Sequence, residues 1–257
     1  MKVKNILVSQ PQPPDLEKSP YGELIKRFNV KIDFHKFIKV EGITAKEFRM
    51  AKGSFSGHTA IILTSRHAVD HFFRMAQELR WEVPDSLKYF CISESTAYYL
   101  QKYVQYRKRK IFYGKQNFAD LMDVIKKHDD EIFLVPSSDI HKQTMFVLLD
   151  QEKVNYTKAV IYKTVASNLS DLDINKYDLM IFFSPSGIKS LQNNFPDYKQ
   201  GEKIIAAFGN TTATAVEEAG FKLNIPAPTQ SAPSMSMAIE EYLLKMAKEN
   251  RKNGRSS

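Results

Sequence analysis

The feature of the sequence that most constrains the fold is an apolar run that stops at a hydroxyl-rich turn. Leu179–Phe183 has the length and composition of one buried strand, and Ser184-Pro185-Ser186-Gly187 follows it directly. A segment with helical spacing then begins at Ile188. The stretch predicts a strand, a tight turn and a helix start, with hydroxyls and free backbone N–H groups at the turn. Because ligands of open α/β sheets collect at the carboxyl ends of strands, this turn is a candidate site.

The same construction occurs earlier in the chain. Ala60–Leu63 is a strand-length apolar run that ends at Thr64 and Ser65, and a helical pattern follows. A second strand–turn–helix unit lies downstream of each of these two units, with Thr96 near the turn of the earlier one and Thr212 near the turn of the later one. Ser65 and Ser184 lie 119 residues apart, and Thr96 and Thr212 lie 116 apart. These similar offsets predict an internal duplication of a domain-sized unit, although any two α/β domains share such units.

Strands and helices alternate along the chain, joined by short loops. Strands are expected within residues 4–9, 30–34, 37–40, 60–63, 89–92, 110–113, 131–135, 158–165 and 179–183, and a further strand is expected to begin at residue 204. Helices are expected within residues 21–28, 44–48, 66–73, 118–127, 144–149 and 235–247. Thr44 is a plausible cap for its helix, with Glu47 three residues later. The alternation predicts an α/β fold with parallel sheets that are covered by helices on both faces.

The order of the two copies predicts an insertion. One copy occupies residues 41–160, whereas the other, from about 170 to 250, lacks its first strands, which residues 1–36 can supply. We therefore expect one discontinuous lobe at 1–36 plus 167–250, an inserted lobe at 41–160, linker strands at 37–40 and 161–166, and a flexible basic tail at 251–257. A cleft between such lobes is a common ligand site.

Composition excludes several classes of protein. Hydrophobic residues make up 43% of the 257 residues and charged residues 26%, as in an ordinary globular protein. No apolar run approaches the roughly 20 residues of a membrane span, and the apolar segment after Met1 is too short for a secretory signal. Cys91 is the single cysteine, which excludes an internal disulfide and a cysteine-built metal cluster. These features favour a cytoplasmic location.

The net charge of +8 favours anionic partners. A basic run at Arg107–Lys110, with Tyr103 and Tyr106 nearby, is a weak candidate for nucleic-acid binding. A solvated loop before a strand is the better interpretation, because no aromatic-interleaved motif extends the run. We therefore expect a small anionic ligand and neither a nucleic acid nor a membrane as partner.

The hydroxyl turns are the strongest candidate site. The 10 glycines form no phosphate loop, and the 6 histidines, including His67 and His71 four residues apart, show no metal-ligand spacing, so no metal is expected. The turns can be simple helix caps, or helix N-termini from both lobes can bind carboxylates or phosphates in one cleft. The candidate substrate-binding residues are Thr64, Ser65, His67, Thr96, Ser184, Ser186, Gly187, Thr211 and Thr212.

Several motifs together resemble the uroporphyrinogen-III synthase family. They span nearly the whole chain in the right order: 62–69, 160–166, 182–187, 206–213, 219–221 and 226–229. The resemblance implies two flavodoxin-like lobes with parallel sheets, the second inserted into the first and joined by a two-stranded linker. The sequence departs from the family's usual pattern at Ser9-Gln10-Pro11, where Thr-Arg-Pro is frequent, at Ser93, where glycine is frequent, and at 136–141, where glycines are sparse.

The resemblance also implies a reaction. A hydro-lyase of this family closes the linear tetrapyrrole hydroxymethylbilane into uroporphyrinogen III, with ring D inverted, water lost and no cofactor, in haem, sirohaem or cobalamin biosynthesis. Hydroxymethylbilane synthase would be the upstream donor. The many carboxylates of this substrate suit a basic protein with hydroxyl turns. The alternative function is a non-catalytic two-lobed protein that binds a tetrapyrrole or another polycarboxylate.

Tyr162, in the expected linker, is the candidate catalytic residue. The leaving hydroxyl of the substrate needs a proton, and a phenol with a pKa of about 10 is protonated at neutral pH. The family resemblance points to the same residue in Ile161-Tyr162-Lys163-Thr164. The alternative is a tyrosine that only packs the linker.

Overall fold

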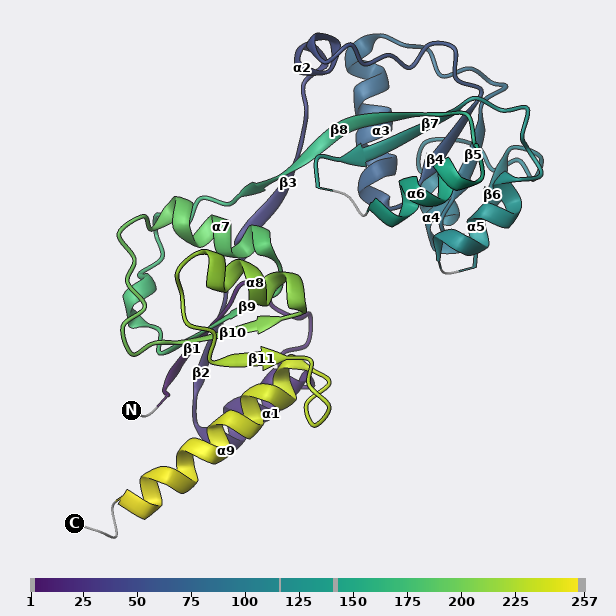
Figure 1. The fold of residues 1–257 in the computed structure, drawn as a ribbon. Helices are drawn as coiled ribbons and strands as arrows, with labels where there is room; N and C mark the ends of the chain where they lie inside the picture. Colours follow the sequence, from purple (N-terminus) through teal and green to yellow (C-terminus); the bar gives the residue numbers. More distant parts are fainter. Residues whose placement is uncertain (1–2, 116, 141–142, 254–257) are drawn as a thin grey trace. The chain divides into compact units, whose positions relative to one another are not determined.

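A computed structural model describes residues 3–115, 117–140 and 143–253, which form two compact units (Figure 1). Unit 1 comprises residues 1–39 and 165–257, and unit 2 comprises residues 40–164. Unit 2 therefore interrupts unit 1 in the sequence. Each unit is an α/β structure built on one sheet.

Unit 1 contains a five-stranded sheet in the order β11-β10-β9-β1-β2, and its strands pair in parallel. The strands are β1 (Asn5–Val8), β2 (Lys31–Phe34), β9 (Leu179–Phe182), β10 (Ile204–Phe208) and β11 (Ile225–Ala227). Because the strands are parallel, their carboxyl ends lie at one edge of the sheet. The turns that begin at Ser9, Ser184 and Gly209 therefore share that edge.

Helices cover both faces of the unit 1 sheet. The helices are α1 (Pro20–Phe28), α7 (Pro185–Asn194), α8 (Asn210–Glu218) and α9 (Met235–Asn253), with a 3₁₀ turn, η1, at Ile174–Lys176. Side chains of α1 and α9 form one core with Ile6 and Val8, whereas α7 and α8 form another with Leu7. Successive residues of β1 thus point to opposite cores, as strand geometry requires. A membrane-spanning helix needs a long apolar stretch, and none of the helices in the described part of the chain has one.

Unit 2 contains a six-stranded sheet in the order β3-β8-β7-β4-β5-β6. The strands are β3 (Ile38–Gly42), β4 (Ala60–Leu63), β5 (Lys88–Cys91), β6 (Ile111–Tyr113), β7 (Phe133–Ser138) and β8 (Tyr156–Ala166). The pairings from β8 to β6 are parallel. The carboxyl ends of β4, β5, β7 and β8 therefore meet at one edge.

Helices also cover both faces of the unit 2 sheet. They are α2 (Ala45–Met50), α3 (Arg66–Leu79), α4 (Glu94–Leu100), α5 (Phe118–Ile125) and α6 (Gln143–Gln151). Helices α2, α3 and α4 share a core with Leu134, whereas α5 and α6 share one with Val135. Helix α2 begins with a capping box of Thr44 and Glu47, which confirms the cap expected from the sequence.

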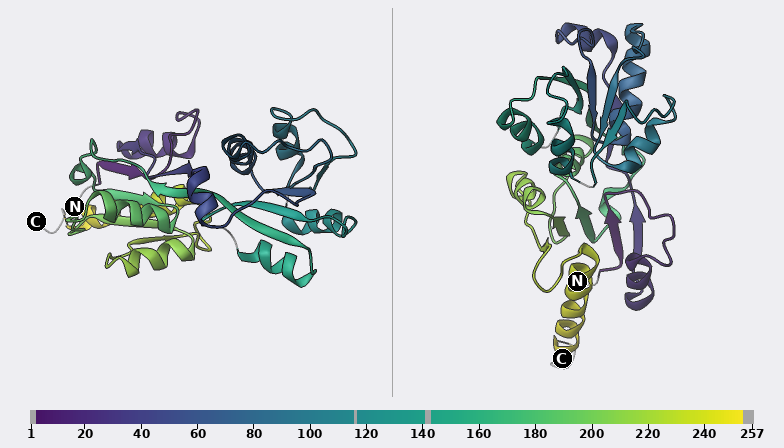
Figure 2. Two further views of the ribbon diagram at one scale, coloured as in Figure 1. Left: turned by 90° about the horizontal axis from the view of Figure 1, so that it is seen from above. Right: turned by 90° about the vertical axis from the view of Figure 1, so that its right-hand side faces the viewer.

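Strands β3 and β8 are the segments in which the chain passes from one unit to the other. The N–H of Ile43 donates to the carbonyl of Ile161 at 3.0 Å, and the N–H of Ser167 donates to the carbonyl of Phe37 at 2.9 Å. The residue numbers of the bonded pairs increase along one segment as they decrease along the other, so the two segments run antiparallel (Figure 2). The segment expected as a short linker at 161–166 is part of an 11-residue strand that belongs to the unit 2 sheet.

The end of the chain differs from the sequence prediction. Helix α9 was expected to end at Ala247 and a flexible tail to begin at residue 251, yet the helix continues to Asn253. The segment 247–253 contains good helix formers such as Lys248, Glu249 and Arg251 and no glycine or proline, so nothing in it stops the helix. Residues 254–257 of the expected tail lie outside the described residues.

Candidate active site

The first hydroxyl turn of unit 2 follows β4. The Ser65 hydroxyl caps α3 by accepting the N–H of Ala68 at 3.1 Å. Thr64 is half-buried and lines a cavity. His67 lies on the exposed first turn of α3 and is not among the residues that line this cavity.

The second turn of unit 2 follows β5. The Ser93 hydroxyl caps α4, which gives this serine a local role where the resembled family often has glycine. It also lies 3.2 Å from the hydroxyl of Thr96. Thr96 is 5% exposed, so its side chain serves the cap inside the unit rather than the surface of the cavity.

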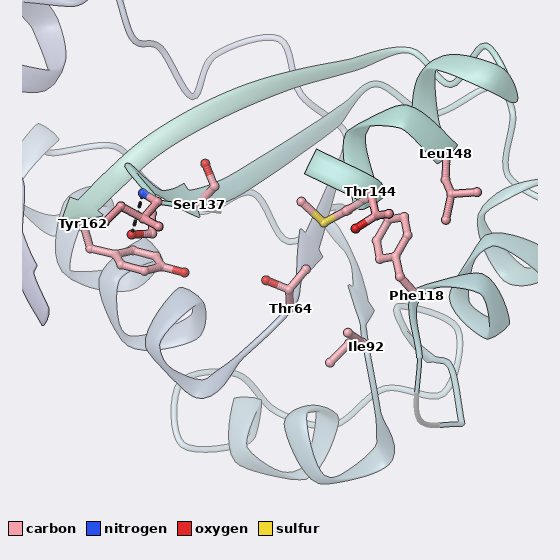
Figure 3. A pocket seen from close by; sticks show the side chains of 10 residues that line it. Thr64, Ile92, Phe118, Ser137, Thr144, Leu148 and Tyr162 are labelled. Carbon is pink, nitrogen blue, oxygen red and sulfur yellow. Dashed lines mark hydrogen bonds between the residues drawn. The ribbon is translucent and has the colours of Figure 1, made fainter. Parts of the chain in front are cut away.

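A cavity of about 360 Å³ lies at the carboxyl ends of the unit 2 strands (Figure 3). Its apolar lining comes from the residue after β5, the loop after β7 and helices α5 and α6. Its hydroxyl groups come from the turn after β4, the end of β7, the start of α6 and the middle of β8. The lining residues are Thr64, Ile92, Phe118, Ser137, Ser138, Ile140, Thr144, Met145, Leu148 and Tyr162. An apolar pocket with a few convergent hydroxyls suits a flat ring with polar substituents.

Tyr162 extends from β8 into this cavity, with its hydroxyl on the side of Thr64 (Figure 3). The residue is 8% exposed, and the ring of His71 stacks on it at 5.0 Å between centroids and 19° between planes. Burial raises the pKa of the Tyr162 phenol, and a hydrogen bond with the Ser65 side chain opposes that rise. The phenol is therefore protonated at neutral pH and can donate its proton. The structure brings three of the predicted residues together here: Thr64, Ser65 and Tyr162.

Ser137 is the unsatisfied polar group of the cavity. The residue is 3% exposed, and its hydroxyl has no hydrogen-bond partner among the residues that the structure describes. The pairing of β7 with β8 shifts register between Ser137 and Ser138, next to Tyr162. A buried polar group without a partner costs roughly 1–3 kcal/mol, so this position favours a ligand or a water that hydrogen-bonds to it.

The loop after β7 supplies a carboxylate that the sequence analysis did not single out. Asp139 accepts hydrogen bonds from the Ser138 hydroxyl at 2.8 Å and from the N–H of Thr164 at 2.9 Å. Its own N–H donates to the carbonyl of Tyr162 at 3.1 Å. Partial burial raises the pKa of Asp139, but these hydrogen bonds outweigh it and hold the pKa below its usual value. Asp139 is thus an ionised anchor beside Tyr162 rather than a proton donor.

The sequence contains a signal for this loop, because Ser137 and Ser138 follow an apolar run as the other hydroxyl turns do. Pro136, Ser137 and Ser138 were expected to end the strand, yet they belong to β7 itself. His141, at the end of the glycine-poor segment noted in the sequence, lies outside the described residues.

The first hydroxyl turn of unit 1 follows β9. The Ser184 hydroxyl caps α7 by accepting the N–H of Gly187 at 3.2 Å. Ser186 is half-buried in the first turn of this helix. Gly187 is buried, and a Cβ added there would meet Phe182 at 3.4 Å. Ser184 and Ser186 thus provide hydroxyl groups at this turn that are partly open to solvent.

The second turn of unit 1 begins helix α8 at Gly209. Its φ of 85° lies in the left-handed region that favours glycine, and no side chain caps the helix. Thr211 is exposed, whereas Thr212 is 1% exposed. The uncapped N-terminus and Thr211 are therefore the groups that this turn offers to a ligand. That these residues and the unit 2 cavity bind one substrate remains a prediction.

One grouping among the described residues resembles a metal site. His128, Asp130 and Glu131 place possible ligand atoms within 4.8 Å of one another. The buried Glu131 carboxylate is paired with the Lys88 ammonium, and the His128 ring packs edge-on against Phe90. Two of the three groups are thus already engaged in packing and pairing, which explains their closeness without a metal.

Comparisons with known proteins point to one family. A family model described as uroporphyrinogen-III synthase HemD matches residues 37–236. A uroporphyrinogen-III synthetase structure from Helicobacter pylori is similar with a TM-score of 0.52 and 18% identity, covering 93% of this chain and 98% of that one. A mutant uroporphyrinogen III synthase from the extremely thermophilic bacterium Thermus thermophilus has a TM-score of 0.46 and 12% identity, with 95% and 99% covered. Curated protein sequences give no match.

Proposed function

Because the chain belongs to the uroporphyrinogen-III synthase family, we propose that it closes hydroxymethylbilane into uroporphyrinogen III, with ring D inverted and one water released. Membership makes the chain a cyclising, lyase-type enzyme of tetrapyrrole biosynthesis that acts on a linear tetrapyrrole. The finer assignments are part of the proposal: a hydro-lyase reaction, a cytoplasmic location, and a substrate delivered by hydroxymethylbilane synthase.

The observation that carries the proposal is the protonated phenol of Tyr162 at the hydroxyl-lined end of a cavity. The substrate hydroxyl leaves as water once it receives a proton, and a positioned donor contributes typically 10²–10⁴-fold. Burial keeps Tyr162 protonated, and Ser65 hydrogen-bonds the phenol in a way that stabilises its anionic form. Ser65 therefore eases the proton transfer that burial alone would oppose.

The apolar part of the cavity suits one pyrrole ring of the substrate. Phe118, Met145 and Leu148 supply apolar contact surface, and the Ser137 hydroxyl supplies a hydrogen bond that no described residue satisfies. A ring in this position would bring its polar substituents to the hydroxyl-bearing end, where Tyr162 lies. The ring would thereby be held where its leaving group can be protonated.

The helix N-termini suit the substrate's carboxylates. Helix α3 has 14 residues, α7 has 10 and α8 has 9, and each begins at the carboxyl end of a strand. Free N–H groups and the helix dipole stabilise a nearby carboxylate by about 0.3–1 kcal/mol each. The net charge of +8 adds a longer-range attraction for a polyanion.

One assay tests the function against its alternative. Hydroxymethylbilane is supplied to the purified chain, and the type I and type III isomers are separated and quantified. Spontaneous closure gives type I, so the proposal requires type III product above the protein-free background. Tight binding of the tetrapyrrole with type I product alone would instead establish a non-catalytic binding protein.

A further inference from the structure

Arg74, in the middle of α3, uses its guanidinium fork on several different partners in unit 2. Its Nε donates to the Nδ1 of His71 at 3.2 Å, and its Nη2 donates to the carbonyls of Ile43 and Ile161, both at 3.0 Å. Its Nη1 pairs with Glu78 one turn along the helix. A planar fork with five donors can serve these acceptors together, which a lysine ammonium cannot do in the same geometry.

Two of these bonds fix the backbone next to Tyr162. The carbonyl of Ile161 belongs to the peptide group that leads into Tyr162, and it also accepts the N–H of Ile43. Arg74 therefore ties α3 to β8 and to the residue after β3 at one point. The position of the Tyr162 Cα depends on that tie.

Gly42 makes room for the guanidinium. A Cβ at this position would lie 2.5–2.6 Å from the Cζ, Nε and Nη2 atoms of Arg74. The end of a free arginine could swing aside, but this one would lose its hydrogen bonds to the Ile43 and Ile161 carbonyls. The backbone of Gly42 is not left-handed, so space rather than conformation requires the glycine.

His71 links the guanidinium of Arg74 to the ring of Tyr162. Because its Nδ1 accepts from Arg74, the ring proton must sit on Nε2, and the imidazole is neutral as it stacks on Tyr162. The groups around it are His67, Asp70 and Arg74 on α3, and Tyr162 on β8. Burial, then Arg74 and His67, lower the pKa of His71, and Asp70 opposes them. A protonated ring would lose the bond to Arg74 and face its positive charge.

We infer that Arg74 is a positioning residue for Tyr162, with Gly42 providing its space and His71 supporting the phenol ring. The inference rests on the proposed role of Tyr162 in the cyclisation. Arg74 contacts no group that reacts, so its loss should lower kcat by letting the phenol move, with little effect on KM. A shift of about 1 Å in a catalytic group can reduce the rate as much as 10²-fold.

The decisive experiment is a double-mutant cycle on type III formation. We expect Arg74→Ala to lower kcat about tenfold in the wild-type background and to have little further effect in the Tyr162→Phe background, because the group it positions is gone. Gly42→Ala should reproduce the loss with the arginine still present. Arg49→Ala, on the exposed side of α2, is the matched control and should leave kcat unchanged. Thermal unfolding identifies any variant that fails to fold.

A pH profile separates positioning from simple structural support. The acid limb of the wild-type kcat profile should be centred below 6.5, the ordinary pKa of histidine, because the pKa of His71 is lowered and the ring becomes protonated only there. His71→Gln, which can accept from Arg74 but does not titrate, should lack this acid limb. Equal effects of Arg74→Ala in both tyrosine backgrounds would overturn the inference and leave the proposed function intact. A wild type without type III product would overturn the proposed function itself.

Discussion

The two units have parallel sheets with hydroxyl turns at the carboxyl edge, yet the chemical groups that they present to a substrate at this edge differ. In unit 2 the turns adjoin a cavity that holds a buried phenol and an unsatisfied serine hydroxyl. In unit 1 the turns offer Ser184 and Ser186 on α7, and Thr211 with an uncapped N-terminus on α8. One edge thus carries a protonated phenol beside a cavity, whereas the other carries hydroxyl groups and an uncapped helix N-terminus. A shared architecture places the turns, and a few side chains beyond them decide the chemistry.

The sharpest test of this difference is Tyr162→Phe. Removal of the phenolic hydroxyl should lower type III formation by roughly 10²-fold, the low end for general acid catalysis, with the fold intact. Thr211→Ala, at the unit 1 edge, should instead raise KM by no more than about fivefold, the net value of one hydrogen bond. Isomer separation after reaction with hydroxymethylbilane measures both.

The control for the tyrosine is Tyr113→Phe, which removes an exposed phenol from the same sheet. Its type III formation should equal that of the wild type. If Tyr162→Phe matched this control, the phenol would have no part in the reaction, and the distinction between the two edges would fail.

A pair of cap variants compares the same local role in both units. Ser65→Ala and Ser184→Ala each remove a helix cap, so each should lower the free energy of unfolding by about 1 kcal/mol in a urea titration. Ser65→Ala should in addition lower kcat about tenfold, because it removes the hydrogen bond to the phenol. An equal drop in kcat for Ser184→Ala would show that catalysis depends on both edges alike.

Ser137→Ala tests the cavity as a ring site. Removing the hydroxyl should weaken substrate binding about fivefold, as expected for one hydrogen bond of roughly 1 kcal/mol, and should raise KM accordingly. The free protein should become more stable by up to about 1 kcal/mol, since a buried polar group without a described partner is lost. Ser95→Ala, exposed on α4, is the control. Lower stability in Ser137→Ala would mean that the hydroxyl is satisfied in the free protein.

The smallest expected change is in the alkaline limb of the pH profile. A general acid works only while it is protonated, and burial raises the pKa of Tyr162 above its ordinary value of 10. Type III formation should therefore stay constant as the pH rises toward 10 and decline only beyond it. A decline centred well below pH 10 would assign the proton donor to another group.

The architecture could be predicted from the sequence because it depends on local patterns. Apolar runs of strand length alternate with helical spacing, and parallel pairing then brings the turns after β4 and β9 to sheet edges. Strand β11 was missed because it has three residues with Pro226 in the middle, and proline is tolerated only at the edge of a sheet, where β11 lies. Helix α9 was predicted too short because its last residues are polar but still favour helix.

The arrangement around Tyr162 could be predicted only in part. The hydroxyls of Thr64 and Ser65 are visible as a strand-end motif, and the tyrosine was predicted from its place in the expected linker and from a family resemblance. Arg74 donates hydrogen bonds to the carbonyls of Ile43 and Ile161, which lie 31 and 87 residues away in the sequence. No local sequence pattern predicts contacts at such separations. The unsatisfied hydroxyl of Ser137 likewise lies beside a register shift that appears only when β7 and β8 pair.

The pairing of β1 with β9 has a consequence for the chain during its synthesis. Ile6 pairs with Leu179, so one side of β1 stays open until the ribosome has made the whole of unit 2. At roughly 5–20 residues per second, that wait is on the order of ten seconds or more. An open strand edge invites pairing with other nascent chains, so we expect residues 1–39 to need shielding while unit 2 folds. Limited proteolysis of released chains that end at residue 178 should cut within 1–39 and spare 40–164, and equal cutting of both segments would contradict this expectation.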